Sequence, residues 1–144
     1  MAVSPYQNHS VLIVDDQEFV LKIVTTILTK IGFGDIKTAT DGATAMAAIE
    51  ESVPDLMICD IGMKPVNGLE LLKSIRQNES GKIRKIPLIF LTGEFSHDLV
   101  EKATSLGCDM FLLKPISPAK LQAKIDDLFD TSVKAPEDVR QAED

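Results

Sequence analysis

Five polar or charged side chains stand directly after apolar stretches of the sequence. They comprise three carboxylic acids, one hydroxyl and one amine: Asp15, Asp16, Asp60, Thr92 and Lys114. If the apolar stretches are parallel strands of one sheet, their carboxyl ends meet at one edge, which is where open α/β sheets bind their ligands. The sequence therefore predicts that these five side chains share a site.

Three crowded carboxylates need a compensating cation. Two carboxylates about 5 Å apart repel each other by roughly 3 kcal/mol at an effective dielectric constant near 20, so such a group either takes up protons or binds a cation. Lys114 offsets only part of this charge. Mg²⁺ is the natural complement, because it takes one or two carboxylates together with waters and phosphate oxygens. With the metal and Lys114 neutralising phosphoryl oxygens, one aspartate is able to act as a nucleophile and form an aspartyl phosphate.

Taken singly, these residues have ordinary structural explanations. Asp16 alone is typical of a helix N-cap, Thr92 of a turn, and Lys114-Pro115 of a loop. It is their joint placement at the ends of strands that favours a common site.

The apolar stretches have the composition of strands that are buried on both faces. Each is rich in Val, Ile, Leu, Met or Phe and does not alternate with polar residues, as in parallel sheets. The four stretches are 11–14, 56–59, 88–91 and 110–113. A fifth strand, 36–39, is short and carries Lys37, which is typical of an edge strand.

Segments with helical periodicity lie between these strands. Their apolar residues recur at spacings of three and four, and the residues at their ends are typical caps. The segments are 19–31, ended by Gly32 and Gly34; a helix opened by Asp41-Gly42; 69–75, preceded by Asn67 with Glu70; 99–106; and 118–128, preceded by Ser117. The alternation of five strands and five helices predicts an α/β fold with a doubly wound parallel sheet.

Composition and charge exclude several classes of protein. The chain has 144 residues, 44% of them hydrophobic, which suits one domain with a real core. Its net charge of −7 is unsuited to nucleic acid, and no apolar stretch approaches the roughly 18–20 residues of a membrane span. The N-terminus does not have the pattern of a signal peptide. Cys59 and Cys108 lie in apolar surroundings without CxxC spacing, so we expect reduced thiols and a cytoplasmic location.

With these residues in place, the chain resembles the receiver domain of two-component response regulators over residues 9–130. The matching motifs are VLIVDD at 11–16, DLMICDIGMKPVNGLELL at 55–72, PLIFLTG at 87–93 and FLLKP at 111–115. The resemblance implies a flavodoxin-like fold with strand order 2-1-3-4-5 in a stand-alone domain. Many receivers have Met-Pro where this chain has Met63-Lys64-Pro65, but the spacing from Asp60 to Gly68 is retained. Residues 131–144 lose the apolar period and are expected to form a flexible acidic tail.

The resemblance implies a role for each site residue. Asp60 would accept the phosphoryl group, and Thr92 and Lys114 would contact it, with a cis peptide bond between Lys114 and Pro115. The Mg²⁺ ligands would be the carboxylates of Asp15, Asp16 and Asp60 and the backbone carbonyl of Gly62. Thr92 would act with Phe111, which occupies the position of the aromatic switch residue. Gly62 and Glu94 are expected to tune the lifetime of the phosphoryl group.

The resemblance also implies a phosphoacceptor signalling protein rather than an enzyme with an independent substrate. It would receive the phosphoryl group from a histidine kinase or a histidine phosphotransfer protein and assist its own phosphorylation and dephosphorylation. It would signal to an unidentified protein target, with neither nucleic acid nor membrane as partner. The expected output face comprises helix 96–106, strand 109–113 and helix 117–130, with candidate contacts at His97, Asp98, Glu101, Lys102 and Ser105.

Three alternative functions remain open on the residues alone. A Mg²⁺-dependent phosphatase with an aspartyl-phosphate intermediate would have a second acid two residues after its nucleophile, where this chain has Gly62. A flavodoxin-like FMN carrier would have a phosphate loop after the first strand, where this chain has Asp15-Asp16. An interaction scaffold that works without phosphorylation would bind its partner equally well as Asp60→Ala.

Overall fold

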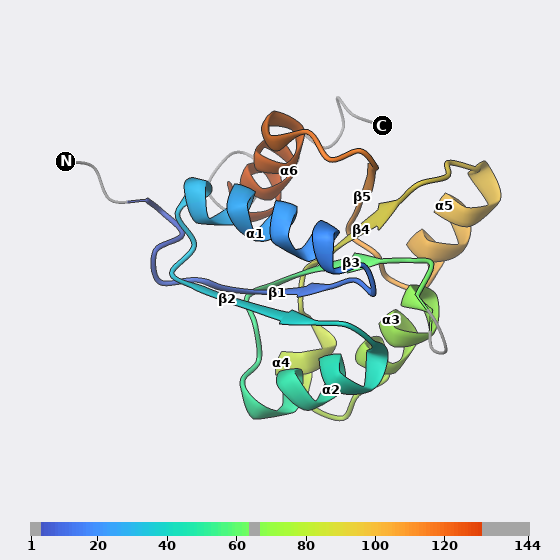
Figure 1. The fold of residues 1–144 in the computed structure, drawn as a ribbon. Coiled ribbons are helices and arrows are strands. Elements are labelled where there is room, and N and C mark those ends of the chain that lie inside the picture. Colours follow the sequence, from blue (N-terminus) through green and yellow to red (C-terminus); the bar gives the residue numbers. More distant parts are fainter. Residues whose placement is uncertain (1–3, 64–66, 131–144) are drawn as a thin grey trace.

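Five parallel strands form a single sheet in the order β2-β1-β3-β4-β5 (Figure 1). The structure is a computed structural model that describes residues 4–63 and 67–130. The strands are β1 Ser10–Val14, β2 Asp35–Ala39, β3 Leu56–Asp60, β4 Leu88–Thr92 and β5 Met110–Leu113. The flavodoxin-like order 2-1-3-4-5 is confirmed, and the short strand that carries Lys37 does lie at an edge of the sheet. The expected tail at 131–144 lies outside the described residues.

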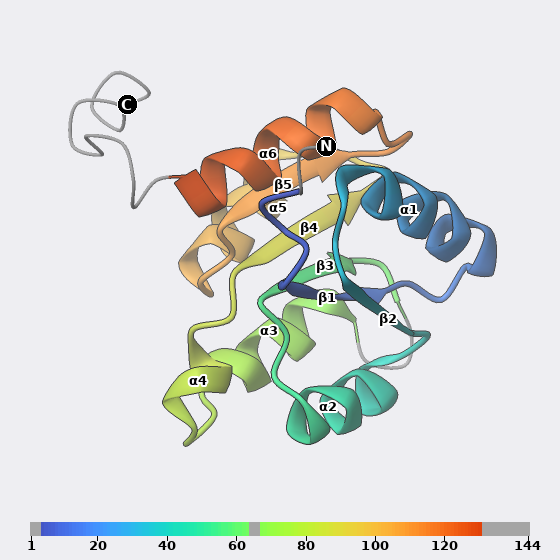
Figure 2. The ribbon, with the colours of Figure 1, turned by 90° about the vertical axis from the view of Figure 1, so that its left-hand side faces the viewer.

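The helices cover the two faces of the sheet unequally. They are α1 Glu18–Ile31, α2 Gly42–Glu51, α3 Gly68–Arg76, α4 Gly81–Arg84, α5 His97–Ser105 and α6 Pro118–Asp130. One face packs against α1 and α6 and the other against α2, α3, α4 and α5 (Figure 2). The five expected helices are all present, and α4 is an additional helix of four residues. None of the helices in the described ranges is long and apolar enough to cross a membrane.

The central strands β1, β3 and β4 are buried on both faces, which explains why their sequences are unbroken apolar stretches. In β3, Met57 and Cys59 pack into the core on the α2 and α3 side, while Leu56 and Ile58 pack into the core on the α1 and α6 side. Every residue of β3 and of β4 is buried. Parallel sheets in α/β proteins require apolar side chains in both directions for this reason.

Local signals at the helix ends place α1 and α3 as expected. The chain leaves α1 at Gly32, whose φ of 109° is a left-handed conformation that favours glycine. Asn67 and Glu70 form the predicted capping box at the start of α3. At Gly68 a Cβ atom would lie 2.6 Å from the Asp60 carbonyl oxygen, so only glycine lets α3 start this close to the end of β3.

The segment before β1 also packs against the domain. The Tyr6 ring is 4% exposed and stacks on Phe33 with 4.9 Å between ring centroids, and the Tyr6 hydroxyl donates a hydrogen bond to the Asp126 carboxylate in α6. The Ser4 hydroxyl donates to the Ile31 carbonyl at the end of α1 (2.9 Å). These contacts join the start of the described chain to α1 and α6, two helices distant in sequence.

Candidate functional site

The five side chains predicted to share a site do meet at the carboxyl edge of the sheet. Asp15 and Asp16 follow β1, Asp60 ends β3, Thr92 ends β4 and Lys114 follows β5. The carboxylates of the three aspartates each offer an oxygen within 4.8 Å of the others. The Lys114 Nζ atom lies 3.2 Å from an Asp15 oxygen and 3.1 Å from an Asp60 oxygen. The pocket therefore holds three carboxylates against one ammonium group.

Asp15 is the most constrained of the three acids. Its side chain is fully buried; one oxygen accepts a hydrogen bond from the Gln17 amide (2.9 Å) and the other from Lys114. Burial raises the pKa of Asp15; the Gln17 amide lowers it and the Asp60 carboxylate raises it again, with a net upward shift. Asp15 is thus held by protein groups that only partly compensate its charge.

Lys114 and Asp16 differ from Asp15 in what surrounds them. Burial by itself lowers the pKa of Lys114, but the hydrogen bond to Asp60 and the charge of Asp15 outweigh burial, so the pKa is raised and the ammonium form is favoured. Asp16 is exposed at the mouth of the pocket. The N-cap of α1 is Gln17, so the interpretation of Asp16 as a helix N-cap is wrong.

Thr92 is in place, but its hydroxyl is already engaged. The Thr92 Oγ1 atom donates to the Glu94 carbonyl (2.8 Å) and accepts from the Glu94 amide (3.2 Å). The Lys114 amide donates to the Thr92 carbonyl (2.8 Å), which ties the ends of β4 and β5 together. The hydroxyl must leave Glu94 before it can bond to a group on Asp60.

The residues expected to tune the site lie on its rim. Gly62 is exposed, and a Cβ atom built on it would lie 3.9 Å from the Asp60 Oδ2 atom. Glu94 is exposed as well. The Lys114-Pro115 peptide bond is cis, as the resemblance implied. Lys64 and Pro65, which shift the proline of the following loop, lie outside the described residues.

Phe111 lies on β5 between the pocket and the neighbouring helices. It is half-buried and contacts Phe90 of β4, with ring centroids 5.8 Å apart at 54°. It also lines a surface groove of about 700 Å³, together with Thr92, Phe95 and Leu113. A continuous surface therefore runs from the pocket to β5 and α6.

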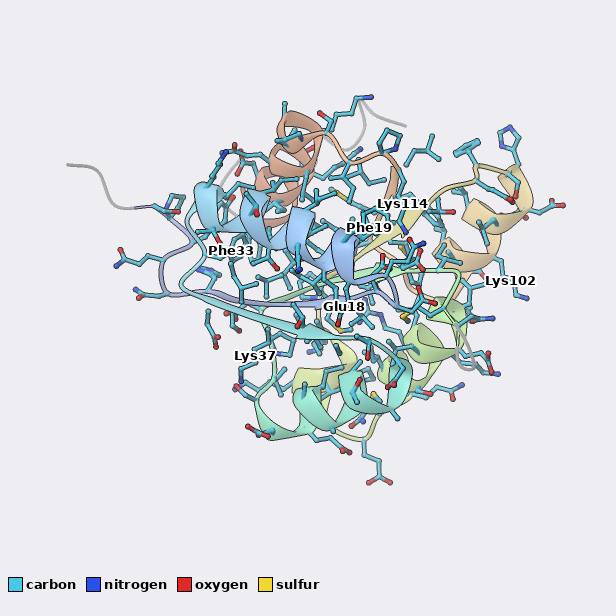
Figure 3. The ribbon with its side chains drawn as sticks, in the orientation of Figure 1. Glu18, Phe19, Phe33, Lys37, Lys102 and Lys114 are labelled. Atoms are coloured by element: carbon cyan, nitrogen blue, oxygen red, sulfur yellow. The ribbon has the colours of Figure 1, made fainter. Side chains whose placement is uncertain are left out.

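Sequence reasoning missed an apolar surface on the other side of Lys114. Phe19 and Ile23 share the helical periodicity of segment 19–31, but they are 61% and 46% exposed. With Pro115 and Ile116 they line a groove of about 400 Å³ that also includes Lys114 (Figure 3). The signal was available in the pairs Phe19-Val20 and Ile23-Val24, which make the apolar arc of α1 too wide for one buried face.

Comparisons with known proteins agree with this geometry. Residues 11–126 match the family model of the response regulator receiver domain. The chain is 31% identical to chemotaxis protein CheY-3 of Vibrio cholerae, over 86% of this chain and 94% of that protein. A crystal structure of a response regulator from Chloroflexus aurantiacus superposes with a TM-score of 0.77 and 27% identity, covering 83% of this chain and 95% of that one.

A second solved structure is a complex of two proteins that contains BeF3 and Mg²⁺. The crystal structure of a CheX-CheY-BeF3-Mg²⁺ complex from Borrelia burgdorferi superposes with a TM-score of 0.77 and 29% identity, covering 84% of this chain and 89% of that one. Receiver domains bind Mg²⁺ at an acidic pocket and are signalling proteins rather than enzymes. The chain therefore belongs to the response regulator receiver domain family and is a CheY-like receiver.

Proposed function

We propose that Asp60 accepts a phosphoryl group from a histidine kinase or a histidine phosphotransfer protein. The observation that carries the proposal is the position of the Asp60 carboxylate, which is 8% exposed, 3.1 Å from the Lys114 ammonium and close to two further acids. An Asp60 oxygen attacks the phosphorus atom, the new P–O bond forms as the donor's P–N bond breaks, and the leaving imidazole takes a proton from solvent water. Lys114 then pairs with the phosphoryl oxygens, whose charge resembles that of the carboxylates it already contacts.

The donor set of the pocket fits Mg²⁺. Three carboxylate oxygens within 4.8 Å of one another are hard ligands of the kind that Mg²⁺ selects. Asp15, Asp16, Asp60 and the Gly62 carbonyl would hold the ion. When bound, Mg²⁺ neutralises negative charge on the carboxylates and on the phosphoryl oxygens. The exposed position of Asp16 leaves that carboxylate free to turn toward the ion.

Exposed apolar groups beside the pocket favour a protein as the donor. Phe19 and Ile23 of α1 lie next to Lys114, in the same groove. Large exposed apolar side chains at a site are typical of protein contact surfaces. A donor protein that covers them brings its phosphohistidine to the open edge of the pocket.

The proposed acceptor is tested with a small-molecule phosphodonor. Incubation with acetyl phosphate and Mg²⁺ should add one acid-stable, base-labile phosphoryl group to the wild type, detected by intact mass spectrometry. Asp60→Asn should remain unmodified, while the matched change Asp127→Asn at an exposed position of α6 should leave the reaction intact. Asp16→Ala should weaken Mg²⁺ binding and phosphorylation together. Retention of the group by Asp60→Asn would overturn the assignment.

We propose that the signal leaves the pocket through α5, β5 and α6. A hydrogen bond to a charged group contributes about 1.5–3 kcal/mol, whereas shifting a population from 1:99 to 99:1 takes about 5.5 kcal/mol. Thr92 alone is therefore too weak, and Lys114 and the metal must contribute. When the Thr92 hydroxyl leaves Glu94, Phe111 can rotate toward the vacated space. Contacts to the target are then expected at exposed positions of α5, namely His97, Asp98, Glu101, Lys102 and Ser105.

The switch is tested by comparing amide chemical shifts with and without the beryllofluoride phosphoryl mimic. The wild type should show shifts across residues 96–130, and Thr92→Ala and Phe111→Ala should reduce them. Thr26→Ala, at an exposed position of α1, is the matched control and should behave as the wild type. Undiminished shifts in Thr92→Ala contradict the mechanism.

Gly62 and Glu94 are proposed to tune the decay of the phosphoryl group, because both stand on the rim that attacking water must cross. The decay of phosphorylated Gly62→Arg and Glu94→Ala should differ from that of the wild type, and unchanged decay in both would contradict this role.

A further inference from the structure

The outer edge of β2 has backbone groups that no strand of the described residues pairs with. β2 (Asp35–Ala39) is the terminal strand beside β1. The Ala39 carbonyl accepts a hydrogen bond from the Asp15 amide (3.1 Å), so it points toward β1. Because backbone groups alternate in direction along a strand, the amides and carbonyls of Ile36 and Thr38 point away from the sheet.

The side chains of β2 form a charge pattern that is complementary to itself. Asp35 and Lys37 are exposed and lie on the α2 side, where both border a small recess beside Ala48 and Ser52. Ile36 lies between them and packs toward the core on the α1 side. If a second β2 pairs antiparallel about a two-fold axis at Ile36, each Asp35 faces Lys37 of the other copy. Opposite charges placed this way stabilise an antiparallel ladder.

The same register satisfies the backbone. Ile36 and its counterpart then form a hydrogen-bonded pair, in which the two residues exchange both of their outward-pointing groups. A two-fold axis at Lys37 would also satisfy the backbone, by pairing Ile36 with Thr38 of the other copy, but it would oppose two ammonium groups. The charges therefore select the register centred at Ile36.

The α1 side of β2 leaves room for a second strand. On the α2 side, Asp35 and Lys37 share a small recess with Ala48, Ser52 and residues of β1. On the α1 side, a groove of about 500 Å³ runs along Thr25, Thr26 and Thr38. In Figure 1, β2 lies between α1 above and α2 below. A copy of the domain that pairs here brings its own α1 and α2 alongside these helices.

We propose that the outer edge of β2 is a homodimer interface, in which two copies pair antiparallel through Asp35, Ile36 and Lys37 and join their sheets into one. A lysine on an edge strand by itself discourages pairing, but here each Lys37 meets an Asp35. The contact has a short ladder and one apolar pair at its centre, so the dimer is weak and depends on concentration. The acid pockets lie beyond the strand ends and stay open, so each copy keeps its phosphorylation site.

A charge exchange tests the pairing in sedimentation velocity experiments up to millimolar concentration. The wild type should dimerise, and Lys37→Asp and Asp35→Lys should each weaken self-association by about tenfold, because each opposes like charges. An equimolar mixture of the two variants should regain the wild-type association. Lys102→Asp makes the same charge change on α5, across the sheet from Lys37 (Figure 3), and should dimerise as the wild type does.

Cross-linking tests the register. Cysteines at Ile36→Cys would face each other across the axis with Cα atoms about 5.5 Å apart, within reach of a disulfide. Cysteines at Thr38→Cys, on the same face of the strand, would lie about 14 Å apart. Under mild oxidation the first variant should form a covalent dimer and the second should not. A wild type that stays monomeric throughout, a mixture that fails to associate, or equal cross-linking of the two cysteine variants would each overturn the proposal.

Discussion

Two charged clusters lie at the two ends of the strands, one where the strands end (the carboxyl edge) and one where they begin. The clusters differ in how completely their charges are matched. At the carboxyl edge, Asp15, Asp16 and Asp60 share one ammonium group, that of Lys114. At the other edge, Arg76 pairs with one carboxylate, that of Asp109 (3.1 Å). The first cluster has excess negative charge, and the second is balanced.

Hydrogen bonding follows the same division. The Arg76 guanidinium donates to the Gly107 carbonyl (3.0 Å) and the Arg84 carbonyl (2.8 Å) as well as to Asp109, which itself accepts from the Leu88 amide (2.8 Å). These bonds join the end of α3 to α4, to the start of β4 and to the turn after α5. At the carboxyl edge, by contrast, three carboxylates have one ammonium group among them, which donates to Asp15 (3.2 Å) and Asp60 (3.1 Å). A saturated cluster fastens elements together, whereas an unsaturated one has capacity left for a ligand.

The largest expected effect is the loss of the balanced cluster. Arg76→Ala removes three hydrogen bonds from a side chain that is 18% exposed, and Asp109, 40% exposed, is partly rescued by water. We expect a loss of about 2–3 kcal/mol in the free energy of unfolding, measured with urea. Lys73→Ala, at an exposed position of the same helix, should change it by less than about 0.5 kcal/mol. Equal effects of the two changes would break the comparison.

At the carboxyl edge we expect a substitution to raise the free energy of unfolding instead of lowering it. Asp60→Asn relieves repulsion among the acids, while Lys114 keeps its contact with Asp15 (3.2 Å). At an effective dielectric constant near 20, the repulsion from two carboxylates about 5 Å away is roughly 6–7 kcal/mol and the lost attraction to Lys114 at 3.1 Å is about 5 kcal/mol, so the variant should gain about 1 kcal/mol in metal-free buffer. Asp16→Asn should gain less, because Asp16 is exposed. Mg²⁺ should reduce the stability difference between these variants and the wild type, because it binds the wild type and stabilises it.

A lower free energy of unfolding for both Asp60→Asn and Asp16→Asn than for the wild type, measured with urea in metal-free buffer, would contradict this prediction. Crowding of the carboxylates would then not be the property that distinguishes this edge of the sheet. Asp127→Asn, at an exposed position of α6, serves as the control for removing one negative charge from an acidic chain.

The carboxyl edge was predictable from the sequence because its residues follow strands with a strong signal. β1, β3 and β4 are buried on both faces, so their apolar stretches stand out, and the residue after each stretch marks the end of a strand. The ends of the strands and the parallel topology were therefore enough to predict which residues meet, and no long-range contact had to be known.

The balanced cluster had no such signal. Arg76 and Asp109 are 33 residues apart, and neither stands at a position that a local pattern marks. The contact of Tyr6 with Asp126 spans 120 residues and is equally invisible in the sequence. Helix α4 has four residues, too few to show a period, although Ser80 caps it. Contacts that join distant segments depend on the finished fold, which local patterns do not encode.

The smallest expected effect is a pH dependence that has opposite signs at a crowded and at a well-solvated carboxylate. Burial raises the pKa of Asp15 above its ordinary value of 3.8, so the folded protein binds this proton more tightly than the unfolded chain does. The stabilisation that protonated Asp15 contributes is fully present below pH 3.8 and is lost as pH rises through the raised pKa.

Asp41 shows the opposite dependence. It caps α2, and the Thr44 amide lowers its pKa, so the stabilisation from its carboxylate is present above pH 3.8 and is lost as pH falls through the lowered pKa. In metal-free urea titrations, Asp15→Asn should therefore gain on the wild type as pH rises through the window above 3.8, and Asp41→Asn should gain on it only as pH falls below that value. If both differences ran in the same direction, burial would not distinguish the two carboxylates.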